Sequence, residues 1–221
     1  MLPFTVDQFL NIFAQYNQAI WPMQLVAYAL GVAVVILAAR PARYSSQIIS
    51  VALACFWGWM GVVYHLMYFS TINPAALGFG ALFIIQAIVW LFFGVVRPKL
   101  AFRLEANPYS ATGLVLIAYA MLVYPLLGNL LGHGYPYSPS LGVAPCPTAI
   151  FTFGILLCTS ARVPKTALII PFIWALIGFT AALSLGIRED IGLLVAGVLS
   201  VGLLLWRDRP LAHTGKRERY A

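Results

Sequence analysis

The sequence has few charged residues for its length, and this shortage excludes an ordinary water-soluble domain. Only 9% of its 221 residues are Asp, Glu, Lys or Arg, whereas 62% are hydrophobic and the mean hydropathy is +0.91. Soluble domains carry about 25% charged residues. At roughly 20 residues for each membrane crossing, the chain has room for about seven transmembrane helices and for no soluble domain of useful size.

Cysteines and the motifs of common enzyme classes are also scarce. The three cysteines, at positions 55, 146 and 158, form no CxxC pair, and two of them lie in apolar runs, which argues against a disulfide framework. The sequence contains no phosphate-binding loop, no HExxH zinc motif and no GxSxG nucleophile motif. These absences favour a protein that is not an enzyme, without deciding the question.

Long apolar runs follow one another along the chain and are joined by short polar segments. Lipid offers the backbone no hydrogen-bond partners, so each run must form a helix. The predicted spans are residues 20–39, 47–69, 75–96, 109–132, 146–161, 166–185 and 191–206. We therefore predict an all-α membrane bundle of about seven transmembrane helices that occupies residues 20–206.

The basic residues predict the orientation of these helices, because Lys and Arg concentrate in cytoplasmic loops. All but Arg188 of the 13 Lys and Arg residues follow the first, third, fifth or seventh predicted span. The N-terminus is therefore predicted to lie outside the cytoplasm and the C-terminus inside, with residues 207–221 as a basic cytoplasmic tail. Because orientation already explains the net charge of +7, nucleic-acid binding is not expected.

Residues 1–19 precede the first predicted span and carry an amphipathic pattern. Thr5 and Gln8 have the spacing of a capping box, which begins a helix. Phe9 and Phe13 recur on one helical face, while polar residues occupy the other. This pattern predicts a short helix that lies on the outer surface of the membrane.

Polar residues gather at the outer ends of several predicted spans. His65 lies about one turn below the outer end of the second span and shares a helical face with Gly58 and Gly61, so its side chain is predicted to face the bundle interior. His133 and Cys146 bracket the longest outer loop. Imidazole and thiolate together prefer cations such as zinc or copper.

Two sets of candidate site residues follow from these positions. The set that would bind a ligand or a metal ion is His65, His133, Cys146, Glu189 and Asp190. The set that would line a cavity is Tyr64, Gln86, Asn129, Thr148 and Thr152. Structural roles stay open for all of them, such as hydrogen bonds between helices or acids that stabilise a helix N-terminus.

Several short motifs extend over nearly the whole chain. They are YNQAIWP at 16–22, YH at 64–65, INPAA at 72–76 with Gln86, YPLLG at 124–128, GHGYP at 132–136, GVAPCPTAIFTFG at 142–154 and EDIGLLVAG at 189–197. In these motifs the sequence resembles a bacterial family of small polytopic membrane proteins of unknown function. The resemblance implies a location in the bacterial cytoplasmic (inner) membrane and lends no catalytic residues.

The polar groups near the outer surface, together with prolines that interrupt helices, are typical of transporter binding sites. We therefore predict a permease, or the binding component of one, for a small solute or metal ion, with a polar site that faces outward. The alternatives are a membrane-embedded metal-dependent enzyme and a structural or assembly protein. The lipid bilayer is the expected partner, and the sequence does not indicate an oligomeric state.

Overall fold

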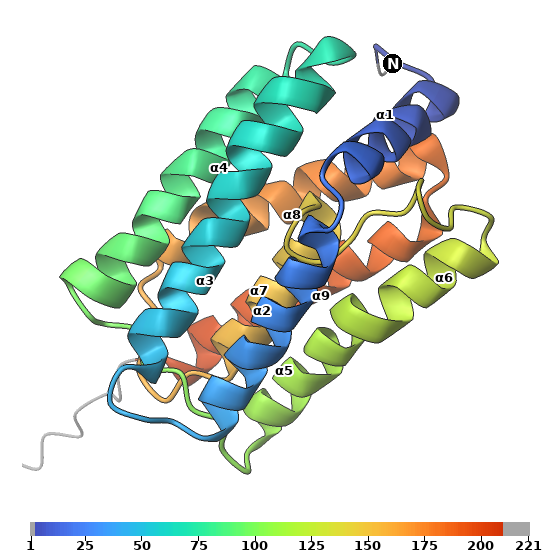
Figure 1. Cartoon of the computed structure of the whole chain (residues 1–221). Helices are drawn as coiled ribbons and strands as arrows, with labels where there is room; N and C mark the ends of the chain where they lie inside the picture. Colours follow the sequence, from blue (N-terminus) through green and yellow to red (C-terminus); the bar gives the residue numbers. More distant parts are fainter. Residues whose placement is uncertain (1–2, 210–221) are drawn as a thin grey trace, which may run out of the picture.

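The computed structural model describes residues 3–209, which form a bundle of helices (Figure 1). Within this part of the chain there is no β-strand, and a single isolated bridge joins Phe102 to Thr159. The predicted all-α fold is confirmed. The elements are α1 (Val6–Ala19), α2 (Met23–Ala39), α3 (Ser45–Trp59), η1 (Met60–Tyr68), η2 (Phe69–Thr71), α4 (Ala76–Leu91), η3 (Phe92–Val96), α5 (Pro108–Ala118), η4 (Tyr119–Val123), α6 (Tyr124–Leu130), α7 (Pro145–Leu157), α8 (Thr166–Leu185), η5 (Arg188–Asp190) and α9 (Ile191–Arg207).

Five continuous helical segments are long and apolar enough to cross a membrane. They are Ser45–Thr71, Ala76–Val96, Pro108–Leu130, Thr166–Leu185 and Arg188–Arg207. A sixth span results if α1 and α2, which meet at 85°, are counted together. Helix α2 has 17 residues and α7 has 13, so the predicted number of seven spans stays a prediction.

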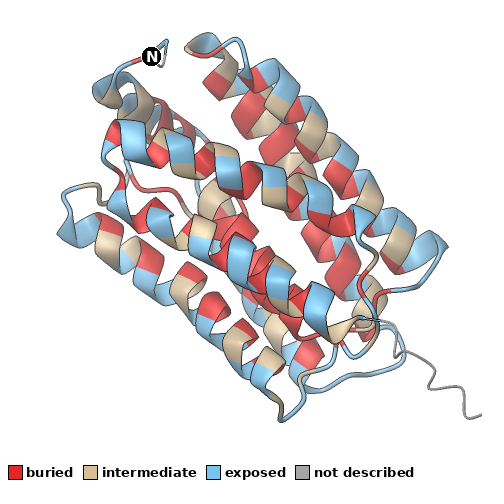
Figure 2. Cartoon of the chain, turned by 180° about the vertical axis from the view of Figure 1, so that it is seen from behind, coloured by how far each residue is buried: buried red, intermediate tan, exposed pale blue. Residues whose placement is uncertain are grey.

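The outer surface of the bundle is apolar, as a lipid environment requires. Large hydrophobic side chains on the outward faces of the helices are strongly exposed, among them Leu122, Leu126 and Leu130 at 68%, 57% and 71%. Figure 2 shows buried and exposed residues alternating along the helices, with the exposed residues on the outside. An apolar surface of this extent suits contact with lipid rather than with water.

Three basic loops and the end of α9 meet at one end of the bundle. The Leu104 amide donates to the Ala38 carbonyl, and the Arg103 amide donates to the Cys158 carbonyl. The Arg207 guanidinium donates to the Thr159 carbonyl at 2.8 Å. We call this the basic end and the opposite one, where α1 lies, the α1 end. Residues 1–2 and most of the predicted basic tail (210–221) lie outside the described residues.

Helix α1 begins with the predicted capping box, in which the Thr5 hydroxyl accepts from the Gln8 amide and the Gln8 side chain accepts from the Thr5 amide. The helix is tied to the long loop before α7. The Asn17 side chain donates to the carbonyls of Pro136 and Ser138, at 2.7 and 2.8 Å. Helix α1 is therefore fixed at one end of the bundle, where it also packs against η1.

The Tyr16 phenol adds a second connection between α1 and the same loop, because it donates to the Val143 carbonyl at 2.7 Å. It also accepts from the Trp59 indole at 2.8 Å. Burial raises the pKa of Tyr16 well above its ordinary value, so the phenol stays neutral and keeps its proton for the Val143 bond.

Helix α7 lies in the centre of the bundle and contacts α3, α5, α8 and α9 (Figure 1). Every residue of α7 except Cys146 is buried. Its backbone touches that of α5 where two glycines meet, since a Cβ atom added to Gly154 would lie 2.7 Å from the Gly113 carbonyl oxygen. Small residues allow such close helix contacts in membrane bundles.

A similar contact joins the second and third predicted spans. A Cβ atom added to Gly61 would lie 2.9 Å from Ile84 Cγ1 and 3.0 Å from the Gly80 carbonyl oxygen. Gly58, on the same face, has more room, because its added Cβ atom would be 3.6 Å from the Ala87 Cβ atom. The glycine face that the sequence indicated therefore packs most closely at Gly61.

Candidate functional site

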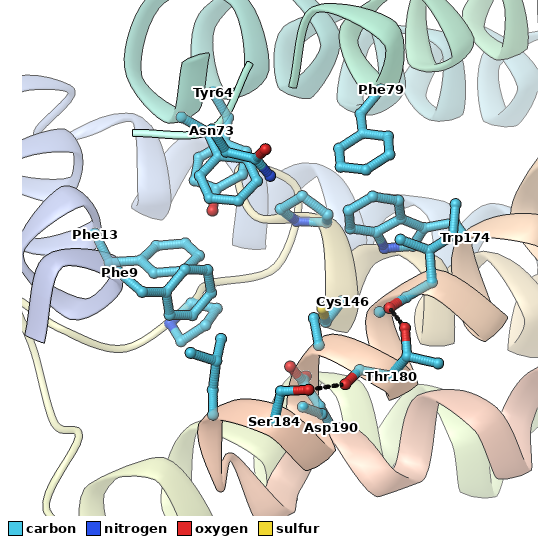
Figure 3. Close-up of a pocket in the computed structure, with 18 of the residues that line it drawn as sticks. Phe9, Phe13, Tyr64, Asn73, Phe79, Cys146, Trp174, Thr180, Ser184 and Asp190 are labelled. Atoms are coloured by element: carbon cyan, nitrogen blue, oxygen red, sulfur yellow. Dashed lines mark hydrogen bonds between the residues drawn. The ribbon is translucent and has the colours of Figure 1, made fainter. Parts of the chain in front are cut away.

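A cavity of about 180 Å³ lies at the α1 end, between α1, η1, the N-terminus of α7 and α8 (Figure 3). Seven of its lining residues are aromatic: Phe4, Phe9, Phe13, Tyr64, Phe69, Phe79 and Trp174. Its polar lining residues are Asn73, Cys146, Thr180, Ser184 and Asp190. None of the described residues that line the cavity is basic.

The aromatic wall is assembled from distant segments. The amphipathic pattern of α1 directs Phe9 and Phe13 into the bundle, and the Phe13 ring stacks on Tyr64 at 5.1 Å between centroids. Tyr64 belongs to η1, a π-helical stretch of the kind that often occurs at functional sites. On the other side, Phe79 and Trp174 meet edge to face at 5.5 Å. Figure 3 shows these rings around a common space.

A buried carboxyl group, that of Asp190, reaches the cavity on the side away from Tyr64 and Phe79 (Figure 3). Asp190 is only 4% exposed, and its Oδ1 accepts a hydrogen bond of 2.5 Å from the Tyr124 hydroxyl. The Cys146 thiol lies beside the same carboxyl group. Asp190 thus contributes an acidic group to a largely aromatic cavity.

The N-terminus of α7 points toward the cavity but offers few donors. Prolines occupy positions 145 and 147, and proline has no backbone N–H group. The site therefore lacks the set of N–H groups with which helix N-termini hold anions. The partial positive charge of the helix end remains and favours a carboxylate nearby.

The Trp174 indole adds a hydrogen-bond donor to the cavity wall. Its Nε1 atom is buried and faces the Cys146 sulfur, and it has no oxygen or nitrogen partner among the described residues. It lies close to Cys146, because a Cβ atom added to Gly178 would be 3.7 Å from Trp174 Nε1 and 3.8 Å from Cys146 Sγ. A ligand in the cavity is therefore offered one hydrogen-bond donor beside the carboxyl group of Asp190.

His133 and Glu189 form a pair behind the cavity. The His133 Nδ1 atom lies 3.6 Å from Glu189 Oε1. Glu189 is 1% exposed, and neither of its carboxyl oxygens has a hydrogen-bond partner among the residues described. The Tyr119 hydroxyl donates to the Glu189 backbone carbonyl at 2.7 Å and fixes this turn of the chain.

The predicted site residues divide into three groups. Tyr64, Cys146 and Asp190 line the cavity, and His133 and Glu189 lie next to it as a pair. His65 faces the interior, as its glycine spacing indicated, but aromatic rings enclose it: Phe83 at 4.7 Å and Trp174 at 5.3 Å between centroids. Neither ring nitrogen of His65 has a hydrogen-bond partner in the described part of the chain.

The remaining candidates are not among the residues that line this cavity. Gln86 donates to the Ala167 carbonyl and joins α4 to α8. The hydroxyls of Thr148 and Thr152 donate to the carbonyls four residues before them, as threonine commonly does within helices. Asn129 is exposed at the α1 end.

The predicted zinc or copper site has no support in the geometry. No group of three or more His, Cys, Asp or Glu side chains within residues 3–209 is arranged to hold a metal ion. The nearest side chains around the His65 ring include the aromatic rings of Phe79, Phe83 and Trp174, which are not metal ligands.

Sequence reasoning identified Tyr64 as a site residue but missed the other aromatic residues of the cavity, and it also missed Tyr124. Tyr124 opens the YPLLG motif, and Trp174 places an indole N–H group inside an apolar run. A polar atom in an apolar span requires a hydrogen-bond partner. The hydroxyl of Tyr124 and the indole N–H group of Trp174 could therefore have identified both residues as site candidates.

The fold and the cavity define a polytopic helical bundle with the composition of a membrane protein and an aromatic cavity that contains a buried acid. The chain belongs to a family of unknown function, DUF6064, whose model matches residues 6–214. This family agrees with the resemblance seen in the sequence motifs. No curated protein and no solved structure matches the chain.

Proposed function

We propose that the protein is a permease, or the binding component of one, for a small organic cation such as a substituted ammonium ion, which binds in the aromatic cavity. The observation that carries this proposal is the buried carboxyl group of Asp190 in a wall of aromatic rings. Aromatic faces attract cations, and desolvated sites of this type are used to recognise quaternary ammonium groups.

The charge balance of the site supports a cationic ligand. Asp190 and Glu189 are both buried, and neither has a Lys or Arg partner among the residues described. A buried carboxylate is costly unless a positive charge compensates it or a proton neutralises it. A cation in the cavity would supply the missing charge, whereas an anion would add to the unfavourable charge.

The proposal is tested with choline and with its uncharged analogue, in which a carbon atom replaces the ammonium nitrogen. Choline is expected to raise the melting temperature of the purified protein, and at 100 times its Kd the stabilisation is about 2.7 kcal/mol. The analogue has the same shape and is expected to give a much smaller shift. Equal shifts for both compounds, or no shift for either, would contradict recognition of a cation.

We also propose that the α1 end faces the outside of the bacterial cytoplasmic membrane and that the basic end faces the cytoplasm. The positions of the basic loops support this orientation, because Lys and Arg concentrate on the cytoplasmic side. The cavity would then receive its ligand from outside the cell.

Cysteine labelling tests the orientation in a background in which the three native cysteines are replaced by alanine. Thr71→Cys and Tyr135→Cys, at exposed positions of the α1 end, are expected to react with a membrane-impermeant maleimide in intact cells. Thr166→Cys, at the basic end, is expected to react only after lysis. The reverse pattern would show that the orientation is wrong.

A further inference from the structure

Two adjacent buried acids face different surroundings at the α1 end. Arg188–Asp190 form a single 3-10 turn, from which Asp190 reaches the cavity and Glu189 reaches His133. The two carboxyl groups are close enough to repel each other when both are charged. Because the two acids are adjacent in the chain, a change in the charge of one acts directly on the other.

The groups that face these acids from neighbouring elements provide no permanent positive charge. Tyr64 of η1, Tyr119 of η4, Tyr124 of α6 and Cys146 of α7 are weak acids, which are neutral or negative. The contacts within 4 Å between acidic and basic side chains of residues 3–209 are His133 with Glu189 and Arg207 with Asp208. His133 is therefore the titratable base of this cluster.

The His133 ring joins the acids to the surface. Its side chain is 22% exposed, while its Nδ1 atom is buried and faces Glu189 Oε1 at 3.6 Å. An imidazole can accept a proton at one nitrogen and release one from the other. A small side-chain movement would bring these two atoms within hydrogen-bond distance.

We propose that His133, Glu189 and Asp190 form a proton relay between the solvent at the α1 end and the cavity. Protonated Asp190 passes its proton to the Glu189 carboxylate, and Glu189 passes a proton to Nδ1 of neutral His133. The imidazolium then releases its other ring proton to water. Asp190 is left as a carboxylate, and the ammonium ion of the proposed function balances its charge. This last step rests on that function, whereas the relay itself does not.

The relay is tested without a ligand, by a rapid change from acidic to alkaline pH in the purified protein. Infrared detection follows the carbonyl band of protonated Asp190, which is identified by its loss in Asp190→Asn. His133→Gln is expected to slow the deprotonation of Asp190 by about 100-fold, the order of effect of a positioned proton-transfer group. Added imidazole is expected to restore the rate, because it replaces the missing proton carrier.

Glu189→Gln is expected to slow the same step, and added imidazole is not expected to restore it. Glu189→Asp keeps the acid, and its rate of Asp190 deprotonation is expected to lie between the rates of the wild type and of Glu189→Gln. This variant replaces Glu189→Gln in the test if Glu189→Gln does not fold. Gln18→Asn, at an exposed position of α1, is the control and should keep the wild-type rate. Unchanged rates in both His133→Gln and Glu189→Gln, or an Asp190 that shows no protonated band, would overturn the relay.

A second measurement tests the coupling to a cation separately from the proton relay. When choline is added to the wild-type protein in weak buffer, the protein is expected to release protons, which a pH indicator detects. Asp190→Asn is expected to abolish this release. A relay that passes the infrared test without proton release by choline would contradict the coupling to a cation and leave the relay intact.

Discussion

Gly154→Leu is expected to prevent the bundle from folding. At this position α5 and α7 touch backbone to backbone, and an added Cβ atom would lie 2.7 Å from the Gly113 carbonyl oxygen and 2.8 Å from Ile117 Cγ1. Because α7 is enclosed by its neighbours, it cannot move away from α5 without disturbing another contact. Overpacking of a closed core costs about 3 kcal/mol or more in such a case.

The measurement is the yield of monodisperse protein in detergent and its melting temperature. Gly202→Leu on α9 and Gly78→Leu on α4 are matched controls, because an added Cβ atom at either position meets no atom within 4 Å. Both controls are expected to behave like the wild type. If Gly154→Leu has the same melting temperature as the controls, the contact between α5 and α7 is looser than described.

Asp190→Asn is expected to lower the affinity for choline by at least about 30-fold, equivalent to about 2 kcal/mol, the lower part of the range for removing one member of a buried charge pair. Asparagine has nearly the same shape as aspartate and can still accept from Tyr124, whose bond to Asp190 is 2.5 Å. The cavity should therefore keep its form and lose its charge.

Equilibrium binding of choline and of its uncharged analogue to the purified protein provides the measurement. The affinity for the analogue is expected to change little in Asp190→Asn. Asp7→Asn, at an exposed acid on α1 at the same end of the bundle, is the charge-matched control. If Asp190→Asn and Asp7→Asn bind choline equally well, Asp190 is not the counter-ion of the ligand.

The sequence predicted the helices well, because apolar length and the backbone's need for hydrogen bonds leave few alternatives in lipid. It also predicted the capping box of α1, since that motif depends on residues three positions apart. It did not predict that α7 is only 13 residues long and buried on all sides. Burial on every face produces no amphipathic pattern, so an apolar run in the core resembles one that faces lipid.

The site was predicted where a polar side chain stands at the end of an apolar run, as at Asp190 and Cys146, or within one, as at Tyr64. The spacing of His65 correctly indicated the interior, but it could not show that Phe79, Phe83 and Trp174 surround the ring. The neighbours of a helical face are set by the packing of other helices. The aromatic wall of the cavity comes from α1 and the residues before it, η1, η2, α4 and α8, and no local pattern connects these segments.

The enclosed position of α7 has a consequence for sequence variation among relatives of this chain. A helix that borders lipid, such as α8 with exposed Ile169, Ile173 and Leu176, can exchange one apolar residue for another on its outer side at little cost. Helix α7 has no such side, because neighbouring helices contact its whole circumference. Substitutions in α7 must therefore be matched by changes in α3, α5, α8 or α9, so its sequence changes slowly and in concert with theirs.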